Sequence, residues 1–289
     1  MTKPMIAIVG PTASGKTALA IDIATQIGGE IICADSRTVY KGLDIGTAKP
    51  TPAERARVPH HLIDIIEPDE RLGAAEFKRL ATDAALEITQ RGNVPLLVGG
   101  SGLYIDAVLY DYQFPPPADP VRRRALEALA LGDLVAMLEQ VDSSAAENTD
   151  LHNSRRVIRA IETAGMGKSR SERLRDATLV LGISVDKEIA RQRITDRVEK
   201  MLTEGFIDEV IWLGKTYGWD CEAFNIIGYR ACKGVAQGTE ERTVGKANFV
   251  AGDIALFRKQ MTWFKRSRDI QWLTDARDAW PLVENFLAV

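Results

Sequence analysis

The residues from Gly10 to Thr17 have the types and spacing of a loop that binds phosphate. They read GPTASGKT, which matches G-x-x-x-x-G-K-[ST], between a short apolar run at 5–9 and a segment with helical spacing. In such a loop the backbone amides and the start of the helix point at one phosphate group. Lys16 adds a mobile positive charge, and Thr17 adds a hydroxyl for Mg²⁺. The motif predicts a diphosphate site without saying whether the ligand is ATP.

An acid after the next apolar run is the first candidate for proton transfer. Asp35 opens the segment DSRTVY, directly after the apolar run at 30–34. Its carboxylate should face the phosphate loop across the end of the sheet, where it could act as a general base. An aspartate before serine is also common as a helix cap or turn residue. Downstream, the polar stretch at 44–50 has little periodicity, and loops of this kind carry function more often than packing.

The acid that ATP- or GTP-hydrolysing proteins use to hold Mg²⁺ is missing from its usual place. That acid directly follows an apolar strand. Here the apolar run at 94–98 is followed by Gly99 and Gly100. Asp64 also follows apolar residues, but it lies in a proline-bounded segment and is a weak candidate. The phosphate loop alone would permit a small-molecule kinase, and the missing acid argues against one.

Arginines in the middle of the chain are candidates for contact with nucleic acid. Arg155, Arg156 and Arg159 cluster on one face of a short helix, with the apolar residues turned away. Such a face either grips an RNA backbone or forms a solvated surface, and the sequence favours neither.

Later arginines are candidates for phosphate binding. Arg193 and Arg197 are spaced by four residues, and they could reach phosphates above the loop or pair with Glu188 or Asp196. Arg230 follows an apolar turn in the sequence IGYR, which makes it a better phosphate ligand than an arginine placed at random.

The histidines and cysteines argue against metal-centred or covalent chemistry. His60 and His61 have no third ligand at zinc-like spacing, so we expect packing or turn roles for them. The three histidines of the chain give no Ser-His-Asp or Cys-His arrangement. Three cysteines without a C-x-x-C pair exclude a disulfide framework and fit a reducing cytoplasm.

The elements that must position these residues alternate between strand and helix. The apolar patterns predict strands at 5–9, 30–34, 94–98 and 178–185, and helices at 18–27, 74–90 and 186–202, with mostly helices from there to the end. This alternation is typical of the α/β class, with a parallel sheet covered by helices on both faces. Strand signals vanish after the proline run at 114–117. We therefore expect a core domain made of 1–114 and 177–289, with an inserted helical domain at 115–176.

Composition bounds the class of protein. The 289 residues are 45% hydrophobic and 27% charged, which is typical of a globular protein and excludes a disordered one. The chain has no apolar run of the roughly 18 residues that a membrane span needs, so we expect no membrane contact and a cytoplasmic location. The net charge of −3 argues against a protein that coats nucleic acid indiscriminately, although the stretch at 255–268 carries five basic residues and no acid.

Eight segments together resemble the bacterial tRNA dimethylallyltransferases. They are GPTASGKT at 10–17, DSRTVYKGLDIGTAKP at 35–50, PHHLIDI at 59–65, VGGSGLY at 98–104, NSRRVIRAIE at 153–162, RITDRVEKMLTEGFIDEV at 193–210, IGYR at 227–230 and KQMTWFKR at 259–266. Each segment except the phosphate loop would be weak evidence for the family by itself. Eight segments in the same order over nearly the whole chain are specific evidence for it. The resemblance implies a P-loop NTPase-like core with a helical insertion. It also implies transfer of a dimethylallyl group from its diphosphate to N6 of the adenosine immediately 3′ of the anticodon (position 37) in tRNA.

The resemblance also implies roles for individual residues. With the arginine candidates above, the donor's diphosphate would contact Gly10, Thr12, Ala13, Ser14, Gly15, Lys16, Thr17, Arg193, Arg197 and Arg230. The tRNA would contact Asp35, Ser36, Arg37, Thr38, Ser101, Arg123, Arg155, Arg156 and Arg159. Asp35 would be the base for the adenine amine, while Lys16, Thr17 with Mg²⁺ and Arg230 stabilise the leaving group. The expected partners are the anticodon stem-loop and dimethylallyl diphosphate, and the expected state is a monomer.

The chain departs from this family's pattern at three places. Members usually carry Gln at the position of Thr38, Thr at that of Ser101, and Thr-Arg-Gln at 253–255, where this chain has Asp-Ile-Ala. Asp253 stands near the basic stretch, where an acid weakens contact with RNA. Three alternatives stay open: prenyl transfer to free AMP or ATP, phosphate transfer by a small-molecule kinase, and RNA binding without catalysis.

Overall fold

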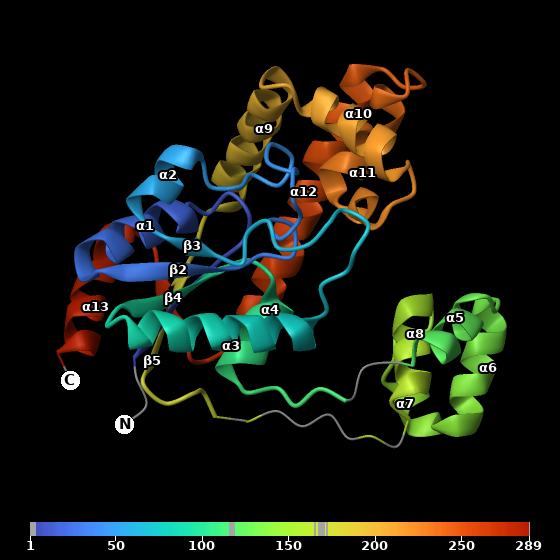
Figure 1. Cartoon of the computed structure of the whole chain (residues 1–289), viewed down its shortest axis with the longest axis horizontal. Helices are drawn as coiled ribbons and strands as arrows, with labels where there is room; N and C mark the ends of the chain where they lie inside the picture. The colour runs from blue at the N-terminus through green and yellow to red at the C-terminus, as the bar shows by residue number, and fades with distance from the viewer. Residues whose placement is uncertain (1–3, 116–118, 165, 167–170, 172, 289) are drawn as a thin grey trace. The chain divides into compact units, whose positions relative to one another are not determined.

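Six parallel strands form the sheet of the larger of two compact units (Figure 1). This computed structural model describes residues 4–115, 119–164, 166, 171 and 173–288, so Pro116 and Pro117 of the proline run lie outside the described residues. The strand order is β3 (His60–His61), β2 (Gly29–Ala34), β4 (Val94–Gly99), β1 (Met5–Val9), β5 (Thr178–Ile183) and β6 (Gln271–Leu273). Each strand pairs in parallel with its neighbours, as the alternation of strand and helix predicts.

The central strands were predicted from their apolar runs, and the two edge strands were not. β3 and β6 are only two and three residues long, too short to show a pattern. β6 also interrupts a region where we expected helices to the end of the chain, and β5 ends at Ile183 rather than at residue 185.

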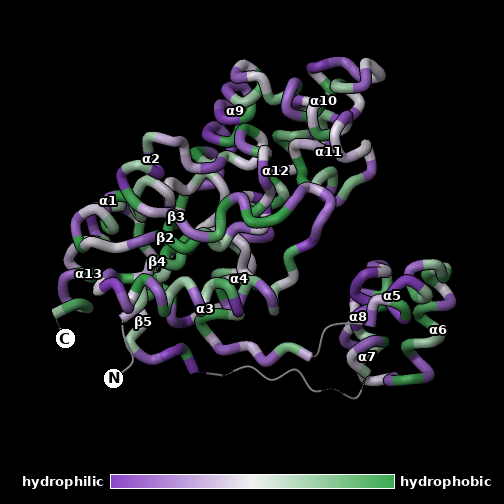
Figure 2. The backbone as a smooth tube through the Cα atoms, viewed as in Figure 1, coloured by the Kyte–Doolittle hydropathy of each residue, from purple (hydrophilic) through white to green (hydrophobic). Residues whose placement is uncertain are grey.

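Alternate residues of the strands bury two apolar faces, and helices cover both (Figure 2). On one face, residues such as Ile8 pack against α1 (Lys16–Ile27) and α13 (Ala279–Leu287). On the other, residues such as Val9 pack against α3 (Ala74–Gln90), α4 (Gly102–Leu109) and the end of α12 (Arg242–Phe264). A parallel sheet covered on both faces, with the phosphate loop between β1 and α1, gives this unit the P-loop NTPase-like fold.

A third apolar cluster holds helices next to the segment that follows β2. Val39, Tyr40 and Leu43 pack with residues of α9 (Lys187–Thr203), α10 (Phe206–Tyr217), the short helix η1 (Glu222–Asn225), α11 (Ile227–Ala236) and α12. The loop beyond them leads to α2 (Pro52–Arg57), which begins with a capping box between Thr51 and Glu54. This cluster fixes the polar residues of 35–50 against the later half of the chain.

The smaller unit, residues 111–171, is helical and has its own core. It consists of α5 (Pro120–Glu127), α6 (Leu131–Val141), α7 (Ser143–Glu147) and α8 (Ser154–Glu162). Its buried residues are Leu126, Leu134, Leu138, Ala146, Val157, Ile158 and Ile161. The units divide after residues 110 and 171, a few residues before the boundaries expected from the sequence.

None of the helices in the described residues is both long and apolar enough to pass through a membrane.

Glu30 is a buried acid with hydrogen-bond partners on three sides. Arg91 donates from Nε (3.0 Å) and Nη2 (2.8 Å), Asn93 donates from Nδ2 (2.7 Å), and His61 Nε2 lies 2.6 Å from Oε2. The Arg91 hydrogen bond is the main reason that the pKa of the Glu30 carboxyl falls to about 2. The network therefore stabilises the fold above the ordinary pKa of a glutamate and loses that effect as pH falls towards 2.

Replacing Glu30 with Gln should lower the free energy of unfolding by about 2 kcal/mol at pH 7, because Arg91 loses its counter-ion. The loss should shrink at pH 3, where part of the stabilisation has already gone from the wild type. Denaturant titration at both pH values measures this difference. Glu76→Gln removes an exposed carboxylate paired with Arg79 and should cost less than about 0.5 kcal/mol. An equal loss for Glu30→Gln at both pH values would contradict the account.

Candidate active site

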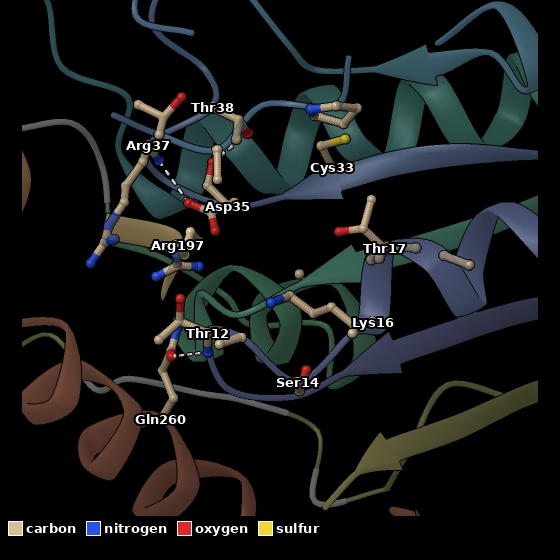
Figure 3. Close-up of a pocket in the computed structure, with 18 of the residues that line it drawn as sticks. Thr12, Ser14, Lys16, Thr17, Cys33, Asp35, Arg37, Thr38, Arg197 and Gln260 are labelled. Atoms are coloured by element: carbon tan, nitrogen blue, oxygen red, sulfur yellow. Dashed lines mark hydrogen bonds between the residues drawn. The ribbon is translucent and has the colours of Figure 1, made fainter. Parts of the chain in front are cut away.

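Three segments leave the sheet at the same level, because the strands before them end in register. Gly99 at the end of β4 pairs with Val9 of β1 on one side and Ala34 of β2 on the other. The phosphate loop, the segment from Asp35 to Thr38 and the turn at Gly100 therefore start side by side. The first two line a common cavity with Gly99, and Figure 3 shows Lys16, Asp35 and Arg197 pointing into it.

The phosphate loop is open at the start of α1. Its N-cap residue, Gly15, has a φ of 88° and provides no side-chain cap, so the first amides of the helix face the cavity without a side-chain partner. Gln260 of α12 holds the loop from outside: its Oε1 accepts from Thr12 N (2.8 Å), and its Nε2 donates to Gly100 O (3.0 Å). Figure 3 shows the first of these bonds. The loop is thus fixed before any ligand binds.

Lys16 is a partly buried cation whose charge is costly to keep. Its Nζ donates to Pro11 O (3.2 Å). Desolvation lowers the pKa of Lys16 to about 8, against the opposing effect of the Asp35 carboxylate, and the charges of Arg197 and Arg37 lower it further. An anion bound at the loop would relieve this cost. The site therefore gains from binding a group with several negative charges.

Asp35 serves both as a turn residue and as a side chain of the cavity. Its Oδ1 accepts from Arg37 N (2.9 Å), which is the turn contact considered for this residue in the sequence. Its other carboxylate oxygen points into the cavity (Figure 3). Asp35 therefore faces the phosphate loop, as predicted, with one oxygen available to a ligand.

Asp253 is a buried counter-ion. Its side chain is 2% exposed, its Oδ2 lies 2.6 Å from Arg197 Nη2, and its Oδ1 lies 3.5 Å from Arg37 Nη1. We expected Asp253 to weaken contact with RNA near the basic stretch; its carboxylate faces inward onto Arg37 and Arg197, and its effect on RNA binding stays a prediction. The predicted pairing of Arg197 with Glu188 or Asp196 was wrong, since Arg197 pairs with Asp253, while its contact with phosphate stays a prediction. Arg197 Nε is buried without a partner in the described residues, which leaves it available to a bound anion.

The place where an ATPase carries its acid has no room for a side chain. A Cβ at Gly99 would overlap the backbone of Ala34, and a Cβ at Gly100 would overlap Gln260 Nε2. These glycines allow the neighbouring strand and α12 to approach. The close packing excludes a strand-end acid at Gly99, and one at Gly100 would displace the Gln260 side chain that holds the phosphate loop, so phosphate transfer from ATP by that arrangement is disfavoured.

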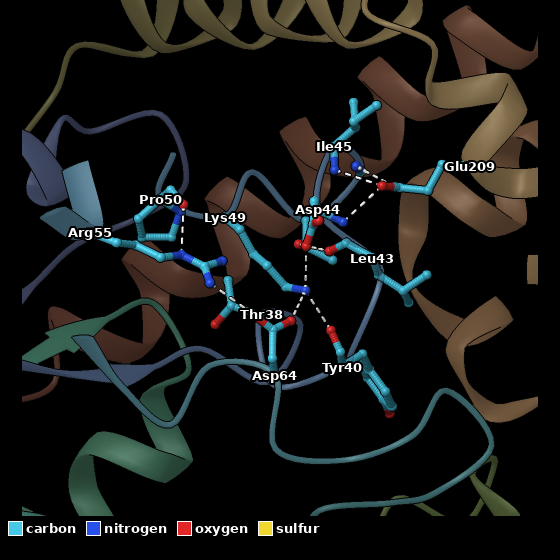
Figure 4. A network of polar contacts seen from close by, with 12 residues as sticks. Thr38, Tyr40, Leu43, Asp44, Ile45, Lys49, Pro50, Arg55, Asp64 and Glu209 are labelled. Carbon is cyan, nitrogen blue, oxygen red and sulfur yellow. Dashed lines mark hydrogen bonds and ion pairs between the residues drawn. The ribbon is translucent and has the colours of Figure 1, made fainter. Parts of the chain in front are cut away.

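The polar stretch after residue 43 supplies one wall of the cavity. Gly46, Thr47, Ala48 and Pro50 line the cavity, with α9 residue Met201 beside them. Buried ion pairs and hydrogen bonds hold this stretch, as Figure 4 shows. Sequence analysis singled it out as a functional loop, and the structure places it at the site.

Other predicted residues lie around the cavity or away from it. Ser101 accepts from Ser36 N (2.9 Å), which joins the ends of β4 and β2. Arg193 is exposed and donates to Ala13 O (3.4 Å) on the outer side of the phosphate loop. Arg230 is exposed on α11 and is not among the residues that line the cavity.

The arginines of the smaller unit divide into two kinds. Arg123 and Arg159 pair with the buried Glu162, at 3.0 and 3.5 Å. Arg155 and Arg156 are exposed on α8, on the side away from Val157, as the spacing predicts. Arg123 joins α5 to α8 through Glu162, Arg159 pairs with the same acid within α8, and Arg156 pairs with Asp150 at the surface (3.0 Å).

Several residues of the cavity were not singled out from the sequence. They are Ala20, Ile31, Cys33, His60, Val98, Met201, Leu256 and Gln260. Gln260 belongs to a segment that carries the family resemblance, and this was the one signal for it. Burial raises the pKa of the Cys33 thiol to about 12, so this cysteine contributes packing rather than a nucleophile.

The oxygen atoms at the cavity fit a magnesium ion that would be coordinated mainly by the phosphate oxygens of a bound substrate. No cluster of three or more acids, histidines or cysteines that could hold a metal exists among the described residues. Thr17 offers one hydroxyl at the cavity, beside the phosphate loop. Mg²⁺ commonly takes one or two protein oxygens and completes its shell with phosphate oxygens and water, so Thr17 is sufficient on the protein side.

Comparisons with known proteins give one family. A family model described as IPP transferase matches residues 38–267, and one described as isopentenyl transferase matches residues 4–64. A tRNA dimethylallyltransferase of Roseiflexus sp. (strain RS-1) is 43% identical over 288 residues, which cover 95% of this chain and 94% of the relative. The solved tRNA isopentenylpyrophosphate transferase of Bacillus halodurans is 35% identical with a TM-score of 0.75, over 99% of this chain and 96% of that one. A eukaryotic dimethylallyltransferase acting on tRNA shares the fold, with a TM-score of 0.87 at 24% identity over 99% of this chain and 80% of that one.

The lowered pKa of Lys16 predicts how anion binding depends on pH. Inorganic diphosphate should bind less tightly as pH rises through about 8, because Lys16 then loses its proton. Lys16→Arg keeps its charge, so the ratio of the wild-type to the variant dissociation constant should rise by up to about tenfold per pH unit above pH 8. Calorimetric titration from pH 6.5 to 9.5 measures the ratio. A ratio that stays constant over this range would contradict a titrating Lys16.

The position of Asp253 predicts a link between stability and anion binding. Asp253→Asn should lower the free energy of unfolding by about 3 kcal/mol, because Arg37 and Arg197 lose a buried counter-ion. Saturating diphosphate should raise the melting temperature of Asp253→Asn more than that of the wild type, since the anion replaces the carboxylate. Asp196→Asn removes an exposed acid next to Arg197 in the chain and should behave as the wild type. Equal shifts for Asp253→Asn and the wild type would refute this role.

Proposed function

Because this chain belongs to the IPP transferase family, we propose that it transfers a dimethylallyl group from dimethylallyl diphosphate to tRNA, at N6 of the adenosine immediately 3′ of the anticodon (position 37). The products are N6-dimethylallyladenosine and diphosphate. The observation that carries the proposal is the cavity itself, in which the phosphate loop and the Asp35 carboxylate face each other. A P-loop kinase would need an acid at the strand end that Gly99 occupies, whereas prenyl transfer needs a base at the acceptor.

The phosphate loop suits the leaving diphosphate. Negative charge gathers on the diphosphate as the bond from the allylic carbon to oxygen breaks. The loop amides, Lys16 and the free Nε of Arg197 lie where they can stabilise that charge more than they stabilise the bound donor. Asp253 and Gln260 hold these groups in place beforehand, so little reorganisation is needed during the reaction. A contact of Arg230 or Arg193 with the donor stays a prediction.

Asp35 suits the adenine amine. The lone pair of N6 is delocalised into the ring, so the amine becomes nucleophilic enough only if its proton is removed as the new bond forms. N6 then attacks the allylic carbon, the bond to the diphosphate breaks, and Asp35 takes the proton. The adenine would reach this position by leaving the stack of the anticodon loop, with Asp35, Ser36, Arg37 and Thr38 around it.

Mg²⁺ is the metal we propose, held by Thr17 and the donor's phosphate oxygens. Bound there, it would add positive charge at the leaving group. The protein residues bind and orient the diphosphate around it. Lys16 and Thr17 occupy successive positions at the start of α1, so both can reach the same phosphate.

The tRNA contacts follow from exposed charge. Arg155 and Arg156 are exposed on the smaller unit, and Arg156 would exchange its pairing with Asp150 for an RNA phosphate, while Arg123 of α5 holds their helix through Glu162. Ser101 positions Ser36 beside the acceptor. We propose that the protein is a monomer. We also propose that it acts in the cytoplasm, since Cys33, Cys221 and Cys232 are free thiols, as expected in a reducing compartment.

Asp35→Asn tests the base. It should reduce prenyl transfer to an anticodon stem-loop by about 10²- to 10⁴-fold, because the amide cannot accept the proton. The dissociation constants of the donor and of the stem-loop should change less than about threefold, since the amide oxygen can still bond to Arg37 N. Product formation by mass spectrometry and binding by fluorescence anisotropy measure the two effects. Asp22→Asn, an exposed acid on α1 that pairs with Arg57, is the matched control.

Two results would overturn parts of this proposal. Undiminished turnover of Asp35→Asn would remove Asp35 as the base. Prenylation of AMP in preference to the stem-loop by the wild type would replace tRNA as the acceptor.

A further inference from the structure

Glu209 of α10 accepts hydrogen bonds from three consecutive backbone amides of the loop that lines the cavity. Its Oε2 accepts from Asp44 N and Ile45 N (both 2.8 Å), and its Oε1 accepts from Gly46 N (2.9 Å). Figure 4 shows the carboxylate facing this loop. Three amides that converge in this way form a site for an anion, and here the anion is a side chain of the same chain. The Tyr229 hydroxyl donates to Oε1 as well.

The other side of the loop is held by a buried cation. Lys49, with a side chain 1% exposed, donates to Tyr40 O (2.6 Å), to Asp44 Oδ1 (2.7 Å) and to Asp64. Asp64 Oδ2 in turn accepts from Arg55 (3.0 Å). Lys49 therefore joins the loop to the backbone of the segment that begins with Asp35. The positive charges of Lys49 and Arg55 balance the negative charges of Asp44 and Asp64. The loop is therefore held by Glu209 on one side and by Lys49 on the other.

The backbone of the loop packs tightly at Gly46. A Cβ at this position would overlap the rings of Phe206 and Tyr229. The backbone therefore lies directly on these aromatic rings. Glu209 lies one turn after Phe206 on α10, so it is next to the same part of the loop. Residues 46–48 and Pro50 line the same cavity as Lys16 and Thr17. This wall presents a glycine, an alanine, a proline and Thr47, whose hydroxyl bonds to Leu43 O.

We propose that Glu209 is a positioning residue that holds this wall in place, so that water is kept away from the allylic carbon of the donor. The inference rests on the proposed function and adds a residue outside the cavity to it. The cationic carbon that develops during transfer reacts with any nucleophile within reach. A wall whose side chains are small, with the one hydroxyl, that of Thr47, bonded to Leu43 O, offers no side-chain nucleophile and leaves no room for water when it stays in place. Glu209 does not touch the substrate and acts through the backbone of residues 44–46.

A displaced wall would permit one specific side reaction. Water would attack the allylic carbon, a new carbon–oxygen bond would form, the bond to the diphosphate would break, and the proton would pass to solvent. The products are a five-carbon alcohol and free diphosphate. Release of diphosphate without prenylated RNA is therefore the signature of a loose wall, and reduced stability alone does not produce it.

Glu209→Gln is the test. One of its two acceptor oxygens becomes an NH₂ group, which faces at least one of the backbone N–H groups of residues 44–46 in either orientation, and two donors form no bond. In full-length protein with anticodon stem-loop, Mg²⁺ and dimethylallyl diphosphate, the kcat for transfer should fall about tenfold, while the KM for the stem-loop changes less than about twofold. The ratio of diphosphate released to adenosine modified should rise at least about threefold over the wild type.

Asp208→Asn and Tyr229→Phe complete the design. Asp208 is an exposed acid in the same first turn of α10, so Asp208→Asn should keep the wild-type ratio. Tyr229→Phe keeps the buried ring and removes one donor to Glu209, so it should raise the ratio by a smaller factor, even if Glu209→Gln fails to fold.

The outcomes separate this inference from the proposed function. A wild-type ratio of diphosphate to modified adenosine in folded Glu209→Gln and in Tyr229→Phe would refute the role of Glu209 while leaving the function intact. Loss of activity in proportion to the unfolded fraction, with an unchanged ratio, would make Glu209 merely structural and would also refute it. No prenylated RNA from the wild type would refute the proposed function itself.

Discussion

The parallel register of three strands is the constraint on which the site depends. Gly99 of β4 pairs with Val9 and with Ala34, so β1, β2 and β4 end at one level. Gly99 has no space for a side chain beside the backbone of Ala34, and Gly100 lies against the Gln260 side chain, which in turn holds the phosphate loop. A register shift of one residue would turn the side chains of a strand to the opposite face and move the groups that follow it. The chemistry of the site is thus set by the hydrogen bonding of the sheet.

The charges around the cavity are balanced before a ligand binds. Asp253 neutralises Arg37 and Arg197 inside the protein, and Glu209 and Lys49 hold the wall formed by residues 46–48 and Pro50. Lys16 remains the group whose charge is least stabilised. Binding of a diphosphate there relieves a cost that the empty site bears, while the other residues keep their positions. Such preorganisation is the general way in which an enzyme stabilises charge that appears only in the transition state.

Much of the core was predictable because its signals are local. The apolar run at 5–9, the phosphate loop and the helix at 74–90 have the predicted positions, since each carries its own pattern and end signals. The edge strands β3 and β6 have no such pattern and form only because a neighbouring strand offers hydrogen bonds. Asp253 could not be predicted as a counter-ion, because its partners lie 216 and 56 residues away in the chain. Likewise, Glu209 meets residues 44–46 only through the packing of α10 on the third apolar cluster.

The central claim is that an ATPase-like loop here binds the leaving group of a prenyl donor. The most direct measurement gives the wild-type protein both substrates at once: an anticodon stem-loop with labelled dimethylallyl diphosphate, and ATP labelled in its terminal phosphate. After digestion, mass spectrometry should find the dimethylallyl label on the adenosine 3′ of the anticodon, with the ATP intact. Unmodified RNA together with transfer of the terminal phosphate of ATP to an acceptor would contradict the account.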